Sequence, residues 1–155
     1  MRLELIHPML VHFPIALLFT GVVLRFAALW SAKRPALYFL LPASWTILGL
    51  GVVAAWAAVT AGEVAEGIVR PTLENSEVLD EHVTHAYRTA IGFTIGLLLD
   101  WIRLFLQKNS WLVKRGLAAV IWIFYLVSLT NLIITGGYGA TLVYEEGAAV
   151  ARENT

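Results

Sequence analysis

The four histidines of this chain are its clearest candidates for chemistry. His7 and His12 begin the first long apolar segment, and His82 and His85 begin the third. Ionisable side chains at the edge of a hydrocarbon layer are costly to place, and they usually have a partner or a function. Imidazole is a common ligand of transition metals and of haem iron. The four side chains therefore predict a ligand set for iron or another metal.

Composition places the chain among integral membrane proteins. Of its 155 residues, 59% are hydrophobic and 14% are charged, whereas a soluble domain carries roughly a quarter charged residues. Four apolar runs approach or exceed the length that a helix needs to cross a bilayer. We expect an all-α fold, a four-helix transmembrane bundle that forms a single integral membrane domain over residues 1–155, with spans at about 9–30, 36–61, 82–106 and 111–135.

Charge predicts how the bundle is oriented. The segment at 62–81 and the tail at 136–155 are expected to be irregular, the tail because Gly136 and Gly137 should break the last helix. Ten of the 11 acidic residues fall at the end that holds the histidines, and Asp100 is the exception. Basic short loops stay in the cytoplasm. We therefore expect a bacterial or archaeal inner (cytoplasmic) membrane protein with both termini outside. The basic residues at the opposite end are Arg25, Lys33, Arg34, Arg103, Lys108, Lys114 and Arg115.

Two classes of function are excluded by composition. The chain has no cysteine, which removes disulfides, thiolate iron–sulfur sites and covalent attachment of haem through C-x-x-C-H. The formal net charge is zero, so nothing in the charge balance suggests nucleic acid.

The depths of the histidines indicate how they would pair. The first and third spans run in the same direction, and His12 and His85 each lie about one turn below their companions. We expect His12 and His85 to be the axial ligands of a haem b. His7 and His82 would serve a second, shallower haem or an additional metal. His7 and His12 are about 140° apart on an ideal helix, so they do not share one face cleanly.

Other ligands and roles stay open at the histidine positions. Arg88, three residues after His85, is placed to pair with a haem propionate. All four imidazoles could instead ring one copper or zinc ion. The simplest alternative is that His7 and His82 are interfacial residues that bond headgroups or loop carbonyls.

Two further patterns bear on helix packing. Arg25 and Asp100 lie at matching depths on parallel helices, which predicts a salt bridge near the inner face. Small residues recur at helix-contact spacing, at Ala54, Ala58 and Gly62 and at Gly92 and Gly96, which favours close packing. The two histidine pairs have different spacings, so they do not establish an internal repeat.

These residues resemble a known family. The opening His7-Pro8-Met9-Leu10-Val11-His12-Phe13-Pro14-Ile15 resembles the H-P-x-x-V-H-F-P-I signature of the DUF2231 family of small, predicted four-span membrane proteins. The segment 60–65 resembles the exit of that family's second span. The tail, from Gly136-Gly137 to Leu142-Val143-Tyr144-Glu145-Glu146-Gly147, resembles its GG-x-LVY-x-x-G ending with extra residues inserted. The family's general layout is similar to that of di-haem b-type membrane cytochromes, which supports haem by analogy.

The sequence thus favours a b-type haem protein that carries electrons near the outer leaflet rather than a stand-alone enzyme. Its expected partners are the lipid bilayer, a quinol or a periplasmic electron carrier, or a larger membrane complex, and a homo-oligomer stays open. Two alternatives remain: a cofactor-free assembly subunit of a larger complex, and a copper- or zinc-binding membrane protein.

Overall fold

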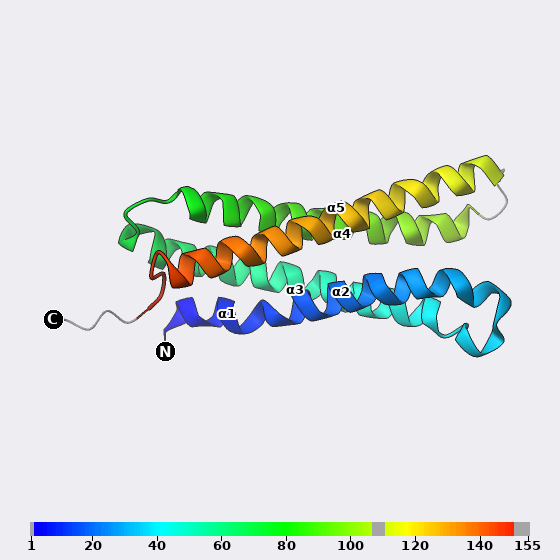
Figure 1. Cartoon of the computed structure of the whole chain (residues 1–155), viewed down its shortest axis with the longest axis horizontal. Coiled ribbons are helices and arrows are strands. Elements are labelled where there is room, and N and C mark those ends of the chain that lie inside the picture. The colour runs from blue at the N-terminus through cyan, green and yellow to red at the C-terminus, as the bar shows by residue number, and fades with distance from the viewer. Residues whose placement is uncertain (1, 107–110, 151–155) are drawn as a thin grey trace.

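The computed structural model contains four long helical rods, which pack into a bundle (Figure 1). It describes residues 2–106 and 111–150, except the side chains of residues 32, 33, 111, 112 and 114. The expected link at 107–110 and the end of the tail at 151–155 lie outside these residues. The first rod is broken at Val11 into two helices. The α-helices are α1 (Ile6–Leu10), α2 (His12–Ala27), α3 (Leu40–Val69), α4 (Glu77–Phe105) and α5 (Trp111–Tyr144), and short 3-10 helices flank them at Leu3–Leu5, Ala28–Lys33, Pro35–Leu37 and Arg70–Thr72.

Successive rods run in opposite directions, as the predicted four-helix transmembrane bundle requires. Arg2 and Ala149 lie at the same end of the bundle, joined by a hydrogen bond. We call it the histidine end because His7, in α1, and His82, near the start of α4, lie there (Figure 1). The rod of α1 and α2 packs on α3, and α4 packs on α5. These two hairpins contact each other less extensively, with α2 and α4 diagonally opposite.

Within residues 2–106 and 111–150, three helical stretches are long and apolar enough to cross a membrane, namely Leu3–Ser31, Pro35–Thr72 and Arg115–Tyr144. α4 is not among them, because charged residues from Glu77 to Arg103 interrupt its apolar sequence. It nevertheless packs along α5 over its length as the fourth rod of the bundle.

Two expectations about irregular segments were wrong. α3 continues to Val69 and α4 begins at Glu77, so most of the segment 62–81 is helical. α5 passes through Gly136 and Gly137 to Tyr144. A glycine costs a helix only about 1 kcal/mol relative to alanine, whereas a broken helix in apolar surroundings leaves backbone groups without partners.

The tail beyond α5 returns over the histidine end. Gly147 adopts a positive φ of 66°, which reverses the chain. Ala148 is then buried against Leu79 and Leu142, and the Arg2 guanidinium donates to the carbonyl of Ala149 at 2.8 Å.

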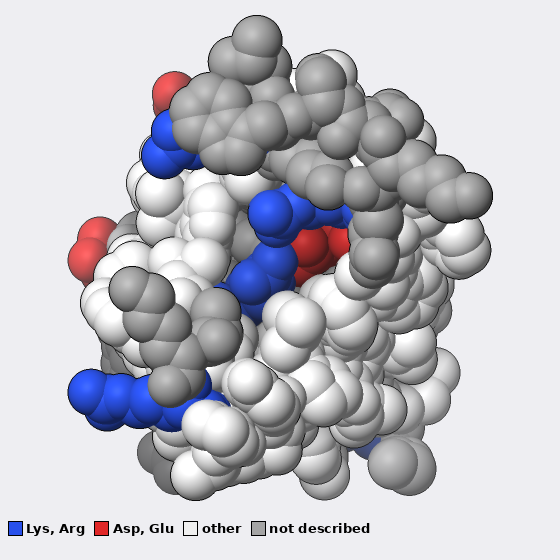
Figure 2. All heavy atoms as spheres, turned by 90° about the vertical axis from the view of Figure 1, so that its right-hand side faces the viewer, with Lys and Arg blue, Asp and Glu red and all other residues white. Residues whose placement is uncertain are grey.

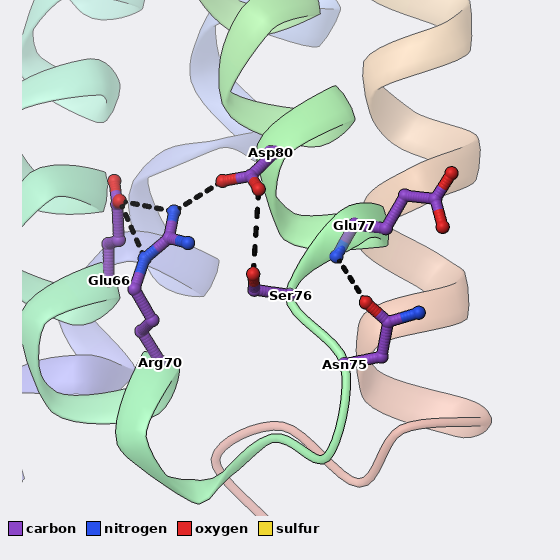
Figure 3. A network of polar contacts seen from close by, with 6 residues as sticks. All are labelled: Glu66, Arg70, Asn75, Ser76, Glu77 and Asp80. Atoms are coloured by element: carbon purple, nitrogen blue, oxygen red, sulfur yellow. Dashed lines mark hydrogen bonds and ion pairs between the residues drawn. The ribbon is translucent and has the colours of Figure 1, made fainter.

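A polar network fixes the short connection between α3 and α4 (Figure 3). Arg70 donates to the carboxylate of Glu66 at 2.7 Å and to that of Asp80 at 2.6 Å, so it joins the end of one helix to the start of the next. Asn75 accepts from the backbone N–H of Glu77 at 2.9 Å, which satisfies a donor in the first turn of α4.

The buried face of the first hairpin repeats in the second. The buried residues of α2 are Pro14, Leu18, Gly21, Val22 and Arg25. At the same successive spacing, α4 buries Thr89, Phe93, Gly96, Leu97 and Asp100. The buried residues Ser44, Leu48, Gly51 and Ala55 of α3 correspond in the same way to Ile121, Tyr125, Ser128 and Leu132 of α5.

Individual contacts repeat as well. A Cβ on Gly21 would meet the side chain of Leu48 at 2.7 Å, and a Cβ on the counterpart Gly96 would meet that of Tyr125 at 2.9 Å. The structure therefore contains an internal repeat of two helical hairpins, which the unequal spacing of the histidine pairs did not reveal. In this repeat the counterpart of His7 is His82.

Candidate functional site

The two histidines at equivalent positions of the repeat meet at the histidine end. The ring centroids of His7, from α1, and His82, from α4, are 6.0 Å apart, and the rings are nearly perpendicular at 89°. α1 and α4 belong to different hairpins, so the pair bridges the bundle. The structure therefore brings together His7 and His82.

Each of these rings is held by a backbone carbonyl within its own hairpin. Nδ1 of His7 lies 2.8 Å from the carbonyl oxygen of Ala58 on α3, and Nδ1 of His82 lies 3.0 Å from that of Thr135 on α5. A carbonyl only accepts, so Nδ1 carries the proton in both rings. The neutral ring then has its lone pair at Nε2. Metal-ligating histidines are typically oriented by such a bond from the other ring nitrogen.

A glycine stands beside each ring. A Cβ on Gly62 would lie 3.1 Å from Cε1 of His7, and a Cβ on Gly139 would lie 3.2 Å from Cε1 of His82. Both glycines lie one helical turn beyond the residue whose carbonyl holds the ring. Each hairpin thus has the same local arrangement, in which a backbone carbonyl and a glycine one turn later position an imidazole inside the bundle.

A cavity of about 370 Å³ opens at this site and is lined by all four rods. His7 and His82 contribute to its wall, and His12 lies at its lining as well. Much of the remaining wall is small or apolar, including Ala55, Ala58, Ala86, Gly136 and Leu132. Ligand sites typically combine an apolar cavity with a few convergent polar groups.

His12 and His85 are not brought together. His12 is exposed, and among the described residues its side chain makes no hydrogen bond. His7 takes the inward face of the first rod, and the angle between positions 7 and 12 then turns His12 outward. This differs from the expected pairing of His12 with His85.

His85 belongs to a separate arrangement between α4 and α5. Its Nδ1 lies 2.7 Å from Oδ1 of Asn131, and its ring stacks on Tyr138 with centroids 5.8 Å apart. Asn131 donates through Nδ2 to the carbonyl of Val127, so its oxygen is free to accept from His85. Glu81 lies 3.7 Å from Nε2 of His85. Asn131 thus forms a hydrogen bond across two helices.

Two further predictions concern an ion bound by all four imidazoles and the role of Arg88. No group of three or more His, Asp or Glu side chains within residues 2–106 and 111–150 could hold a metal ion. The expectation of one ion ringed by four imidazoles therefore finds no support there. Arg88 is exposed and, in the described part of the chain, forms no hydrogen bond.

A second polar cluster lies at the opposite end of the bundle and takes one residue from each rod. Arg25 donates from Nε and Nη2 to the two carboxylate oxygens of Asp100, at 2.6 and 2.8 Å. Trp45 donates to Oδ2 of Asp100 at 3.0 Å, and the Tyr125 hydroxyl donates to it at 3.4 Å. The expected salt bridge is thus confirmed.

This ion pair is buried, with side-chain exposures of 6% for Arg25 and 1% for Asp100. Figure 2, which views this end of the bundle, shows basic side chains gathered around a hollow in which acidic atoms are visible. Because the carboxylate of Asp100 is fully engaged by protein donors, the arrangement serves structure better than it serves transport of an ion.

Several features of the site escaped sequence reasoning. Gly62 was noted only as a member of a small-residue row, and Gly139 only as part of the tail. The carbonyls of Ala58 and Thr135 have no side-chain signature at all. The signal that would have found them is the repeat itself, in which His7 and Gly62 recur as His82 and Gly139.

Comparison with known proteins agrees with the membrane character of the bundle. The family model DUF2231, described as a predicted membrane protein, matches residues 4–152. No curated protein and no solved structure matches the chain.

Proposed function

We propose a function for a chain that belongs to the DUF2231 family of predicted membrane proteins: it binds one b-type haem between His7 and His82 and carries electrons near the outer leaflet. In this proposal α4 crosses the bilayer together with the three apolar stretches. Both termini face outward from a bacterial or archaeal inner membrane, in keeping with the basic residues at the other end.

The observation that carries the proposal is the approach of His7 and His82 from two hairpins. Haem iron in membrane bundles takes axial imidazoles from facing helices. Here both rings are oriented through Nδ1 by a carbonyl, which leaves Nε2 as the nitrogen able to ligate iron. The repeat supplies one such pair, so the proposal is one haem per chain.

The surroundings of the pair suit a flat, apolar group. The cavity is lined by all four rods, and Gly62 and Gly139 allow the two rings to pack closely against α3 and α5. An apolar shell also controls the reduction potential of a bound haem by limiting water and local charge. Arg88 keeps its proposed role as partner of a propionate that reaches the surface of the bundle.

His7 and His82 would together hold the haem, and a haem held by two imidazoles would supply electron transfer rather than chemistry on a bound substrate. The electron donor or acceptor would be a quinol or a periplasmic carrier, or another subunit of a larger membrane complex.

The test is a visible spectrum and a metal analysis of the full chain, purified in detergent from cells supplied with a haem precursor. A reduced-minus-oxidised α-band with a Soret peak, at about one haem per chain, is the expected result. If the protein contains copper or zinc and shows no such band, the haem proposal is overturned in favour of a copper- or zinc-binding protein. If the purified protein contains neither haem nor metal, the proposal is overturned in favour of a cofactor-free assembly subunit.

A further inference from the structure

Arg25 and Asp100 occupy equivalent positions in the two hairpins. Each lies one turn beyond a glycine of the repeat, Gly21 in α2 and Gly96 in α4, and each is the last buried residue of its helix. His7 and His82 are also equivalent. The diagonal rods therefore contact each other through both of these pairs, and in each pair a residue meets its own counterpart.

These two meeting points lie at opposite ends of the bundle. Position 100 is about 27 Å from position 82 along α4, given a rise of about 1.5 Å per residue, and positions 25 and 7 are separated by the same number of residues. Since contact within each hairpin is more extensive than contact between them, the register of one hairpin on the other depends strongly on such bridging pairs.

We infer that Arg25 and Asp100 are positioning residues for the His7–His82 site, and that the pair works with its two charges exchanged. The part of this inference that concerns haem binding rests on the proposed function. The ion pair fixes the hairpins relative to each other. This register is carried to the histidines along α4 and along the first rod, where backbone hydrogen bonds from Val11 to His7 and from Ile15 to Val11 continue across the break. Two like charges at these equivalent positions would repel, so opposite charges are required.

The repeat supplies the surroundings that an exchanged pair needs. Asp100 accepts a bond from the indole of Trp45, and the counterpart of Trp45 in the second hairpin is Trp122. The Trp122 ring packs on Phe26, the residue next to Arg25, with centroids 5.9 Å apart. An aspartate at position 25 would therefore have an indole donor close by.

One bond has no counterpart after the exchange. Tyr125 donates to Asp100, but its counterpart in the first hairpin is Leu48, which has no donor. At 3.4 Å this is the longest of the bonds to the carboxylate. The exchanged pair would keep a guanidinium–carboxylate contact, with Trp122 near the aspartate in place of Trp45, and it would lose the bond from Tyr125.

The test uses four variants of the full chain in detergent: Arg25→Gln, Asp100→Asn, the double exchange R25D/D100R, and Arg103→Gln. Arg103 is the matched control, because it is a charged residue of α4 at the same end but outside the pair. Three quantities are measured: the thermal unfolding midpoint, haem bound per chain, and the rate at which diethyl pyrocarbonate modifies His7 and His82, determined by mass spectrometry.

Each single change in the pair should lower the midpoint and raise the modification rate of His7 and His82 at least twofold, although the change lies at the far end of the bundle. The double exchange should return both quantities to the values of Arg103→Gln. A purely local role would leave the two histidines as protected as in the control, and that result would overturn the inference.

Failure of the exchange to restore midpoint and protection would overturn the equivalence of the two positions. If the single variants do not fold, the double-exchange variant alone is the test. A double-exchange variant that folds and keeps His7 and His82 protected supports the inference, and one that does not fold contradicts it. A wild-type chain without haem would reject the proposed function only, since chemical modification of the histidines requires no cofactor.

Discussion

His7 and His82 face each other at 6.0 Å between ring centroids, and they occupy equivalent positions of two helical hairpins. A backbone carbonyl orients each ring and a glycine makes room for it, once in each hairpin. A bundle of two similar hairpins thus builds a two-imidazole site from two copies of one local device. The bundle and this site should therefore be sensitive to three kinds of change: side-chain size next to a histidine ring, the buried core shared by the two hairpins, and the ion pair at the opposite end.

The space beside the His82 ring should be sensitive to side-chain size at Gly139. A leucine there would carry its Cβ to within 3.2 Å of Cε1 of His82, with further atoms beyond it, and would displace the ring. We expect Gly139→Leu to reduce haem content at least fivefold, measured from the reduced α-band of purified protein.

Gly137 is the control for this change, because it lies in the same helix and a Cβ added to it would meet nothing within 4 Å. Gly137→Leu should retain full haem content and should not lower the unfolding midpoint, since leucine is the better helix former. Equal haem loss in both variants would mean that neither reports on the ring.

The core beneath the repeat should show a strong contrast between two leucines of α3. Leu48 is fully buried at 0% exposure, whereas Leu50 is 53% exposed. We expect Leu48→Ala to lower the free energy of unfolding by about 2–5 kcal/mol, because it leaves a cavity. Leu50→Ala should cost far less. Chemical unfolding in mixed detergent measures both, and similar losses would contradict the packing described.

The indole bond to Asp100 should contribute measurably to stability. Trp45→Phe leaves one oxygen of a buried carboxylate without this donor, and we expect a cost of about 1–3 kcal/mol. Trp56→Phe is the comparison, because the Trp56 indole donates to the neutral hydroxyl of Thr94 at an exposed position rather than to a buried carboxylate. If Trp56→Phe proved the more costly change, the buried network would not be the main polar link between the hairpins.

Much of the fold followed from the sequence. Hydropathy predicted four rods, and matching depth predicted the pairing of Arg25 with Asp100. The angle between positions 7 and 12 showed that only one of these histidines would face inward cleanly, but it did not show which one. That choice depends on how the first rod packs on α3, where the Ala58 carbonyl accepts from His7.

The rest was hidden for physical reasons. Gly136 and Gly137 are local helix breakers, but the surrounding bundle keeps α5 continuous because no other backbone partners are available there. The repeat preserves few identical residues, such as Gly21 with Gly96 and Trp45 with Trp122. What it preserves is the spacing of buried positions, which becomes visible only when burial is known.

The most direct test of the two-imidazole site is the reduced-minus-oxidised spectrum of three single variants, His7→Ala, His82→Ala and His12→Ala, each compared with the wild-type chain. We predict that the first two lose the α-band. His12→Ala should keep it, because the His12 side chain is exposed and makes no hydrogen bond within the described residues. Loss of the band in His12→Ala, with its retention in His7→Ala and His82→Ala, would contradict the central claim.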